Sequence, residues 1–305
     1  MQNFDLNLLR ALDALLTEKN VTRAADKVFV TQSTMSGMLG RLRDQFSDRL
    51  LIRSGRRYDL SPLAQSLATS VRQTLLQIDA TISAKPLFDP KTDRRSFKIM
   101  ASDYATVTYL SEVFRRIARS APLLGFEVVP IDSPLDSVRN GNVDLCVTGN
   151  PEIKINNHPD QLLRHDILFS EVYCCVVDQH HPLNGRLSID SYFKFPLVLA
   201  QFSGVTMATR LMGLESSASQ PNTVITVPTF SVIPSLVIGT QSIGVVPKRM
   251  VNALPTNAGM RVLALPFEGP SFTEQLIWHS RFAYDPAFCW LRSLMLDVAQ
   301  EQSES

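Results

Sequence analysis

The sequence predicts an α/β protein overall, with an N-terminal winged helix-turn-helix, a long linker helix and an α/β domain of two subdomains. Three short helical segments and a basic turn fill the first 60 residues. An apolar repeat with a period near 3.5 residues follows, and strand-like runs then alternate with helical stretches to the end of the chain. The 305 residues, 45% of them apolar, are enough for two or three domains with buried cores.

The first three helices are predicted from their apolar spacing and their capping residues. Residues 5–17 place leucines on one helical face. Asn20 is expected to cap a second helix over 21–28, and Thr31 is expected to cap a third over 32–46. Residues 53–60 then predict a two-stranded turn around a glycine, with arginines at its tip, which is a wing.

The third helix has one apolar face and one face of small residues. The inward face holds Met35, Leu39, Leu42 and Phe46, and the opposite face holds Ser33, Gly37, Gly40 and Asp44. Each glycine in a helix interior costs about 1 kcal/mol relative to alanine. Close approach of the helix backbone to DNA would offset this cost, because glycine removes the steric barrier. Close packing against another helix and simple tolerance are the alternatives.

Positive charge is concentrated around the predicted wing, although the whole chain has a net charge of only +1. Residues 1–60 hold ten Lys and Arg against seven Asp and Glu, and residues 41–57 hold six Arg against two Asp. DNA binding requires a basic surface of this kind. We expect the first turn of the third helix to contact base edges through Gln32, Ser33 and Ser36. We expect contacts to phosphates or the minor groove from Thr22, Thr31, Arg53, Arg56 and Arg57.

Residues 62–84 are predicted as one long helix with an apolar seam. The seam positions alternate in spacing between four and three: Ala64, Ala68, Val71, Leu75, Ile78 and Ile82. A period of 3.5 residues over about three heptads is typical of a helix that pairs with a partner, so we expect dimerisation here. An amphipathic helix packed on its own domain is the alternative.

The rest of the chain predicts two α/β subdomains with a cleft between them. Strand-like runs between residues 97 and 280 alternate with helical stretches, which favours parallel sheets covered by helices. The predicted domains are 1–61 for the winged helix-turn-helix, 62–85 for the linker helix, 86–95 for a hinge and 96–305 for the α/β domain. Within the last, subdomain I covers about 96–161 and 261–305, and subdomain II covers about 162–260.

Other features disfavour several classes of protein. The sequence has no apolar signal segment and no run of membrane-spanning length, so we expect a cytoplasmic location and no membrane partner. The cysteines form no C-x-x-C pair, and buried structural thiols and redox sensing are the two interpretations of Cys146, Cys174, Cys175 and Cys289. No catalytic motif and no metal-ligand spacing occurs, so we expect no enzymatic activity, no metal and no cofactor.

The first sixty residues resemble a known family. Residues 20–62 read NVTRAADKVFVTQSTMSGMLGRLRDQFSDRLLIRSGRRYDLSP. This stretch is similar to the winged helix-turn-helix of the LysR-type transcriptional regulators. The matching features are the Ala24–Ala25 pair, the T-Q-S-x-x-S stretch over 31–36, the Leu42–Arg43 pair and the D-x-L-x-x-R run over 48–53. Further matches at 88–90, 102–104, 141–149 and 278–292 make the chain similar, nearly end to end, to the branch with the nodulation regulators and the salicylate-responsive regulator.

The resemblance implies roles for individual residues of the helix-turn-helix. The start of the family's recognition helix is matched by Gln32, Ser33, Thr34 and Ser36, and its usual basic positions by Arg41 and Arg43. Gly37 and Gly40 depart from the family, whose members more often have long polar or basic side chains there. The family also implies promoter DNA as a partner and a homodimer or homotetramer paired through the linker helix. We expect RNA polymerase as a further partner.

The resemblance further implies a domain similar to a periplasmic binding protein, with a small-molecule effector between its subdomains near free backbone N–H groups. By matching position, the expected effector-binding residues are Ser102, Asp103, Tyr104, Gly149, Gln201, Phe202, Ser203, Thr229 and Phe230. The branch implies an aromatic or phenolic effector. Asp103 would repel an acidic one and is alternatively a helix cap, while Tyr104 and Phe230 are alternatively core residues.

Residues and resemblance together predict a sequence-specific DNA-binding transcriptional regulator whose oligomer geometry is controlled by an effector. One alternative is an effector-independent DNA-binding protein whose cleft is closed or filled by side chains. The other is a solute-binding protein, which the basic first sixty residues and the missing signal segment disfavour.

Overall fold

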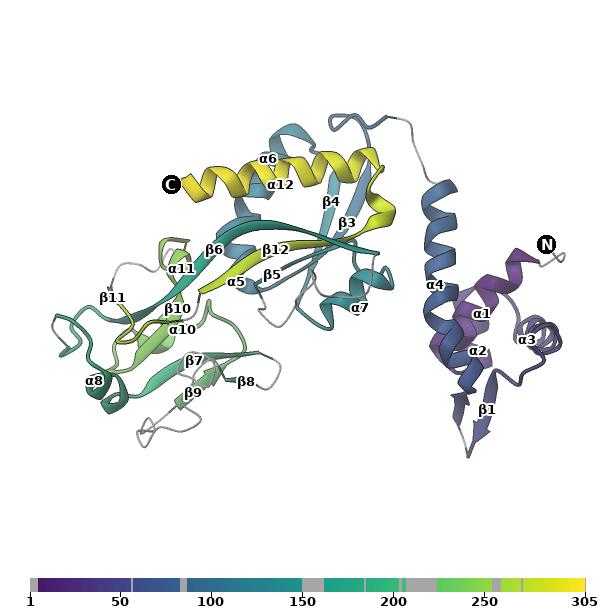
Figure 1. Cartoon of the computed structure of the whole chain (residues 1–305), viewed down its shortest axis with the longest axis horizontal. Coiled ribbons are helices and arrows are strands. Elements are labelled where there is room, and N and C mark those ends of the chain that lie inside the picture. The colour runs from purple at the N-terminus through teal and green to yellow at the C-terminus, as the bar shows by residue number, and fades with distance from the viewer. Residues whose placement is uncertain are drawn as a thin grey trace. The chain divides into compact units, whose positions relative to one another are not determined.

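The computed structural model describes residues 5–55, 57–82, 87–149, 162–183, 185–202, 205–206, 224–253, 259–269 and 271–304. The chain separates into two compact units (Figure 1). The N-terminal unit comprises Met1–Lys85 with Arg139–Gly141, and the C-terminal unit comprises Pro86–Val138 with Asn142–Ser305. Each unit has its own hydrophobic core.

The N-terminal unit is a winged helix-turn-helix followed by a long helix, as the sequence predicts. Its elements are α1 (Leu6–Glu18), α2 (Val21–Lys27), α3 (Gln32–Phe46), the wing strands β1 (Leu51–Ser54) and β2 (Arg57–Leu60), and α4 (Pro62–Ile82). The Asn20 side chain accepts a hydrogen bond from the backbone N–H of Arg23, and Thr31 accepts one from Thr34. Both predicted caps are therefore confirmed, and local sequence sets where α2 and α3 begin.

The core of the N-terminal unit is formed by α1, α3 and α4. Leu12 of α1 and Met35 and Leu42 of α3 are fully buried, which confirms the inward face predicted for α3. A partly buried ion pair lies beside them: Arg72 Nη1 of α4 is 2.8 Å from Asp13 Oδ2 of α1, and the two side chains are 33% and 12% exposed. Apolar contacts and this ion pair together fix the first part of α4 to α1.

The apolar seam of α4 divides between two environments. Ala64 and Val71 are buried in the core of their own unit, and Ala68 and Leu75 pack against that core. The expectation that the whole seam faces a partner is therefore wrong for Ala64 and Val71, because α1 packs along this part of α4. Ile82, at the other end of the seam, is 78% exposed.

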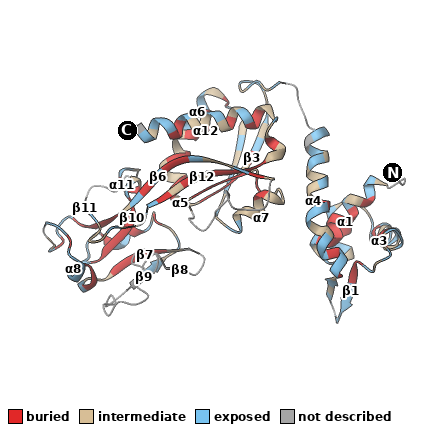
Figure 2. Cartoon of the chain, viewed as in Figure 1, coloured by how far each residue is buried: buried red, intermediate tan, exposed pale blue. Residues whose placement is uncertain are grey.

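The C-terminal unit is built on one mixed sheet. Its strands are β3 (Arg95–Ala101), β4 (Leu124–Val129), β5 (Leu145–Thr148), β6 (Leu163–Asp178), β7 (Leu197–Phe202), β8 (Val205–Thr206), β9 (Val224–Val227), β10 (Ile243–Pro247), β11 (Met260–Leu263) and β12 (Ser271–His279). Their order is β4-β3-β5-β12-β6-β10-β7-β8, with β11 beside β6 and β9 beside β7. The buried residues lie mainly along these strands (Figure 2).

One long strand joins two halves of this unit. The 16 residues of β6 pair with β12 along most of their length and with β10 and β11 at their end. We call β3, β4, β5, β12 and the start of β6 the first half, and β7 to β11 with the end of β6 the second half (Figure 1).

Helices cover both halves. In the first half, α5 (Asp103–Ala105), the π-helix η1 (Thr106–Leu110) and α6 (Ser111–Ser120) follow one another, and α7 (Pro134–Arg139), the 3₁₀ turn η4 (Ser280–Phe282) and α12 (Pro286–Glu304) complete it. The second half has α8 (Ile189–Lys194), α10 (Ile233–Val237) and α11 (Lys248–Ala253). Among the described residues, no helix combines the length and the apolar character needed to span a membrane.

The sheet differs from the expected one in direction and in boundaries. β3 is parallel to β4 and β5, but β12 is antiparallel to β5 and β6, so the expectation of parallel sheets holds only in part. The start of β6 belongs to the first half rather than to subdomain II, and β11 belongs to the second half rather than to subdomain I. Both boundary differences have one cause, which is that β6 is a continuous strand shared by the two halves.

Candidate nucleic-acid interface and effector site

The start of α3 presents small hydrogen-bonding side chains to solvent. The exposed residues here are Gln32, Ser33, Thr34 and Ser36. The hydroxyl of Thr31 caps the helix and also lies 2.9 Å from Ser33 Oγ and 2.8 Å from Thr34 Oγ1. Each hydroxyl can donate one hydrogen bond and accept two, so this first turn keeps capacity for an external partner.

The glycines of α3 face open space. A Cβ atom built on Gly37 or on Gly40 meets nothing within 4 Å. Close packing of these glycines against another helix is therefore ruled out within the part of the chain that the structure describes. A smooth stretch of helix backbone is left on the face opposite Met35 and Leu42.

The wing and α2 present further predicted contact residues. Arg53 and Arg57 are exposed on the two wing strands, and Arg53 Nε donates a hydrogen bond to the carbonyl of Gly55 at 3.3 Å. Thr22 is exposed in the first turn of α2. Arg56 lies outside the described residues.

The two arginines of α3 differ in their partners. Arg41 is exposed and forms an ion pair with Asp5 at 3.2 Å. Arg43 is half-buried: its Nε donates to the carbonyl of Arg49 at 2.9 Å and its Nη2 to that of Leu51 at 3.4 Å. Arg43 thus holds the backbone that leads into the wing, which is a positioning role that its sequence position did not reveal.

An exposed aromatic residue lies at the joint between α2 and α3. Phe29 has a left-handed backbone (φ 59°) and is 96% exposed. The left-handed region costs a residue with a side chain about 1–2 kcal/mol. The tripeptide joint was expected, but the left-handed conformation of its first residue has no signal in the sequence, because glycine or asparagine usually occupies such a position.

In the C-terminal unit, the predicted effector residues after β3 make local and cross-half hydrogen bonds. Ser102 caps α5 by accepting from the N–H of Ala105. Asp103 Oδ2 accepts from the backbone N–H of Ser231, just before α10, at 2.8 Å. Asp103 therefore caps a segment of the second half, while its Oδ1 is buried with no hydrogen-bond partner.

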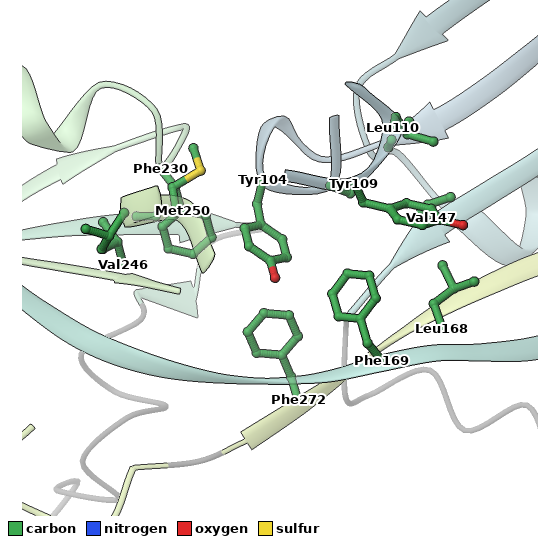
Figure 3. Packing of buried hydrophobic residues seen from close by; sticks show 14 of the residues in the cluster. Tyr104, Tyr109, Leu110, Val147, Leu168, Phe169, Phe230, Val246, Met250 and Phe272 are labelled. Carbon is green, nitrogen blue, oxygen red and sulfur yellow. The ribbon is translucent and has the colours of Figure 1, made fainter. Parts of the chain in front are cut away.

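Aromatic rings fill the space around Tyr104 (Figure 3). Its ring centroid lies 5.7 Å from that of Phe272 and 6.4 Å from that of Phe230, and all three rings are buried. Tyr173 adds a fourth ring, 5.1 Å from Phe272. A Cβ atom on Gly149 would lie 2.2 Å from Phe272 Cδ2, so the glycine is required for this close approach.

The remaining predicted effector residues lie near the ends of other strands. Gln201 is in register with Thr206 across β7 and β8, and Phe202 ends β7. Thr229 lies between β9 and α10, where its hydroxyl is 3.5 Å from that of Ser231. Ser203 lies outside the described residues.

Two buried carboxylates were missed by the sequence analysis. Glu171 of β6 and Glu274 of β12 are 4% and 1% exposed. Burial and the neighbouring charge of Glu171 raise the pKa of Glu274 to about 8. The available signal was a single acid inside each apolar strand run, in FSEVYCC and in FTEQLIW.

Thiols and metal-ligating side chains offer no further site in the described ranges. Cys146, Cys174 and Cys175 are free and buried, and burial raises their thiol pKa, which disfavours the reactive thiolate. Cys289 is free and exposed. Within residues that the structure describes, no group of three or more His, Cys, Asp or Glu is arranged to hold a metal ion.

Comparison with known proteins gives matches over both units. Residues 6–65 match the model for the bacterial regulatory helix-turn-helix protein of the lysR family, and residues 90–300 match the model for the LysR substrate binding domain. Nodulation protein D 1 of Mesorhizobium japonicum is 36% identical over 308 residues, covering 99% of this chain and 95% of that protein. Nodulation protein D 2 of Rhizobium leguminosarum bv. phaseoli is 35% identical over 309 residues, covering 100% and 95%.

A solved structure agrees in fold along nearly the whole chain. A full-length OxyR variant from Pseudomonas aeruginosa is 17% identical, covers 98% of this chain and 96% of its own, and has a TM-score of 0.67. The two family matches, together with the full-length relatives, establish that the chain belongs to the LysR family of bacterial transcriptional regulators, with a helix-turn-helix and a substrate-binding domain.

Proposed function

We propose that this regulator binds promoter DNA through α3 and the wing, and that a small molecule in its C-terminal unit controls the geometry of its oligomer. The observation that supports DNA binding best is the exposed face of α3, which combines a hydroxyl-rich first turn with a bare glycine stretch. The core of the N-terminal unit is complete beneath this face, so its exposure has no structural purpose within the chain.

In this proposal, Gln32, Ser33 and Ser36 contact base edges, and Arg53 and Arg57 contact the backbone beside the wing. Phosphate contacts release counterions when the protein binds DNA. Two chains with two such arginines each make four contacts, so affinity for promoter DNA is expected to fall by about 100-fold between 50 and 200 mM salt. A gel-shift series over this range tests the point. A flat response to salt would contradict the phosphate contacts.

Matched substitutions separate the interface from general surface effects. Ser33→Ala and Arg57→Ala are expected to weaken DNA binding without changing oligomer mass. Ser66→Ala on α4 and Arg119→Ala on α6 alter exposed residues of the same types, and both are expected to bind as the unchanged protein does. Normal binding by both interface variants would refute the proposed contacts.

We propose that the end of α4 pairs two copies of the chain, with a tetramer as the larger assembly. Ile78 and Ile82 belong to the predicted seam, and Ile82 leaves a large apolar side chain in solvent. Replacing both with Asp is expected to lower the mass measured by light scattering, because two charges would be buried in an apolar helix pair. An unchanged mass would exclude this pairing.

The effector is proposed to be a small aromatic or phenolic compound bound near Tyr104, Gly149 and Phe230. We also propose that the protein has no catalytic step of its own, acts in the cytoplasm and has RNA polymerase as a further partner. An effector-independent DNA-binding protein is the second candidate, supported by the packing of the buried rings of Tyr104, Phe230 and Phe272 against one another around the proposed effector residues.

A thermal-shift screen of aromatic acids, phenols and quinones separates these two candidates. A ligand present at 100 times its dissociation constant stabilises the folded state by about 2.7 kcal/mol. The only two tryptophans, Trp278 and Trp290, both lie in the C-terminal unit, so their fluorescence follows that unit alone. A shift with any compound favours effector control, and Gly149→Ala, which crowds the same space, is then expected to abolish the shift.

A further inference from the structure

Hydrogen bonds from both halves of the C-terminal unit meet at Glu171. The hydroxyl of Tyr104, from α5 in the first half, donates to Glu171 Oε2 at 2.5 Å. The backbone N–H of Arg249, from α11 in the second half, donates to the same oxygen at 3.2 Å, and Arg249 Nε lies 3.6 Å away. Glu171 thus connects the two halves through one carboxylate oxygen.

Two further hydrogen bonds cross between the halves beside this carboxylate. The N–H of Ser231 in the second half donates to Asp103 in the first, at 2.8 Å. Arg249 Nη1 donates to the carbonyl of Gln302 on α12, at 2.8 Å. We call the contacts of Glu171, Tyr104, Arg249, Asp103 and Ser231 the latch. All of them depend on the present position of one half against the other.

Glu274 lies next to the latch on the neighbouring strand. In the antiparallel register of β6 and β12, Glu171 is opposite Phe272 and Glu274 is opposite Phe169. The two acids are therefore diagonal neighbours on one face of the sheet. Glu274 Oε1 lies 3.1 Å from the position of a Cβ atom on Gly149, and Oε2 is buried with no hydrogen-bond partner.

The surroundings of Glu274 provide little compensation for a second negative charge. Two pairs of packed rings belong to the same core: the ring centroids of Tyr104 and Phe272 are 5.7 Å apart, and those of Tyr109 and Phe169 are 5.6 Å apart (Figure 3). Burial raises the pKa of both tyrosines, and the charge of Glu274 acts on both and raises it further. The titratable and charged groups around the two acids, taken element by element, are Asp103 and Tyr104 (α5), Tyr109 (η1), Cys146 (β5), Cys174 (β6), and Lys248 and Arg249 (α11). Lys248 is exposed, and Arg249 is the cation that contacts Glu171. Arg249 also contacts the carbonyl of Gln302, and its guanidinium carbon lies 4.5 Å from the centroid of the Phe169 ring.

We propose that the latch is closed when Glu274 is a neutral acid, and that loss of the Glu274 proton to water opens it. Two buried carboxylates that are diagonal neighbours on one face of the sheet cannot both be charged beneath an aromatic cover at low cost. The inference rests on the proposed control of the oligomer by the C-terminal unit, and it adds a second input to that control, which is a rise in pH.

The expected size of the response follows from linkage. The pKa of Glu274 is raised from 4.5 to about 8 in the closed form, so stability of that form is highest at low pH and is lost as pH rises through 8. With an ordinary carboxyl pKa in the open form, the closed form loses about tenfold in population relative to the open form between pH 7 and pH 9.

The test uses the full chain without ligand or DNA. Hydrogen exchange of the Ser231 amide, corrected for its intrinsic rate, reports the cross-half bond to Asp103, and tryptophan fluorescence reports unfolding of the C-terminal unit. From pH 7 to pH 9 we expect Ser231 protection to fall by about tenfold and the unfolding temperature to fall with it. In Glu274→Gln both responses should be absent. The control Glu268→Gln, at an exposed acid of the same unit, should behave as the unchanged protein does.

Two results would overturn the proposal. One is a Glu274→Gln variant that keeps the full pH response, and the other is an unchanged protein whose Ser231 protection is constant from pH 7 to pH 9. The second measurement needs no variant, so it decides the matter even if Glu274→Gln fails to fold. Since neither readout involves DNA or effector, failure of the latch and failure of the proposed function are distinguishable.

Discussion

The two glycines of α3 allow a direct test of how this helix meets DNA. Gly37→Ala and Gly40→Ala each add one methyl group to a helix interior, where the space around the new Cβ atom is empty to 4 Å. Each change should therefore give the full helix-propensity gain of about 1 kcal/mol, with no clash to subtract. The two positions are neighbours on the helix surface, three residues apart, so the double variant should gain between about 1 and 2 kcal/mol rather than the full sum.

Stability and DNA affinity are expected to move in opposite directions. A gain of 1 kcal/mol raises the unfolding temperature of a domain of this size by about 4–8 °C, which circular dichroism at 222 nm can follow. If the backbone of α3 approaches DNA over this face, each methyl group should weaken promoter binding by about tenfold, equivalent to 1.4 kcal/mol. Thr69→Ala, an exposed helix position on α4, is the control that stabilises without altering α3.

The result that would refute this reasoning is a glycine-to-alanine variant that is stabilised but binds DNA with unchanged affinity. The glycines would then be tolerated rather than used, and the close approach of α3 to DNA would be refuted. A variant with lowered stability would contradict the open space described around both positions.

Three further predictions concern stability. A double-mutant cycle with Asp13→Asn and Arg72→Met tests the ion pair between α1 and α4. Denaturant unfolding of the N-terminal unit should give a coupling energy of about 1 kcal/mol, since the pair is only partly screened by solvent. Zero coupling would contradict a role of this pair in fixing α4. Gly149→Ala should cost about 1–3 kcal/mol by tryptophan fluorescence, because a Cβ atom 2.2 Å from the Phe272 ring forces that ring to move; an unchanged midpoint would be incompatible with this packing. The Ser61 hydroxyl and the backbone N–H of Leu50 hold the pKa of Asp48 below its usual value, so this carboxylate stabilises the fold above about pH 4 and the effect is lost as pH falls. Asp48→Asn should therefore lower the unfolding temperature at pH 7 and have little effect near pH 3, and an equal loss at both would argue against ionisation as the cause.

The parts of the fold that were predicted depend on residues close together in the sequence. The start of α3 follows from the Thr31 cap, and its buried face follows from the spacing of Met35, Leu39 and Leu42. The strands over 224–227 and 243–247 have the bounds expected from their apolar runs. Local capping and periodicity are enough for such elements, because the information lies within one or two turns.

The parts that were missed depend on partners far along the chain. The first half of β6 contains Arg164, His165 and Asp166, and these polar residues conceal a strand that exists because β12 pairs with it. Glu171 links the two halves through hydrogen bonds from Tyr104 and Arg249, which lie 67 and 78 residues away in the sequence. The burial of Ala64 and Val71 likewise required the position of α1, which a heptad spacing alone does not specify.

The place of β12 in the sheet has a consequence for how the protein is made. β12 is the last strand in the chain, yet it lies between β5 and β6 in the middle of the sheet. On the ribosome, the first half of the C-terminal unit lacks its central strand until residues 271–279 have emerged, whereas α1 to α4 and both wing strands lie within the first 82 residues. A chain ended early by a stop codon before Ser271 would contain every residue of the helix-turn-helix but an unfinished sheet in its C-terminal unit, with the edges of β5 and β6 exposed to aggregation.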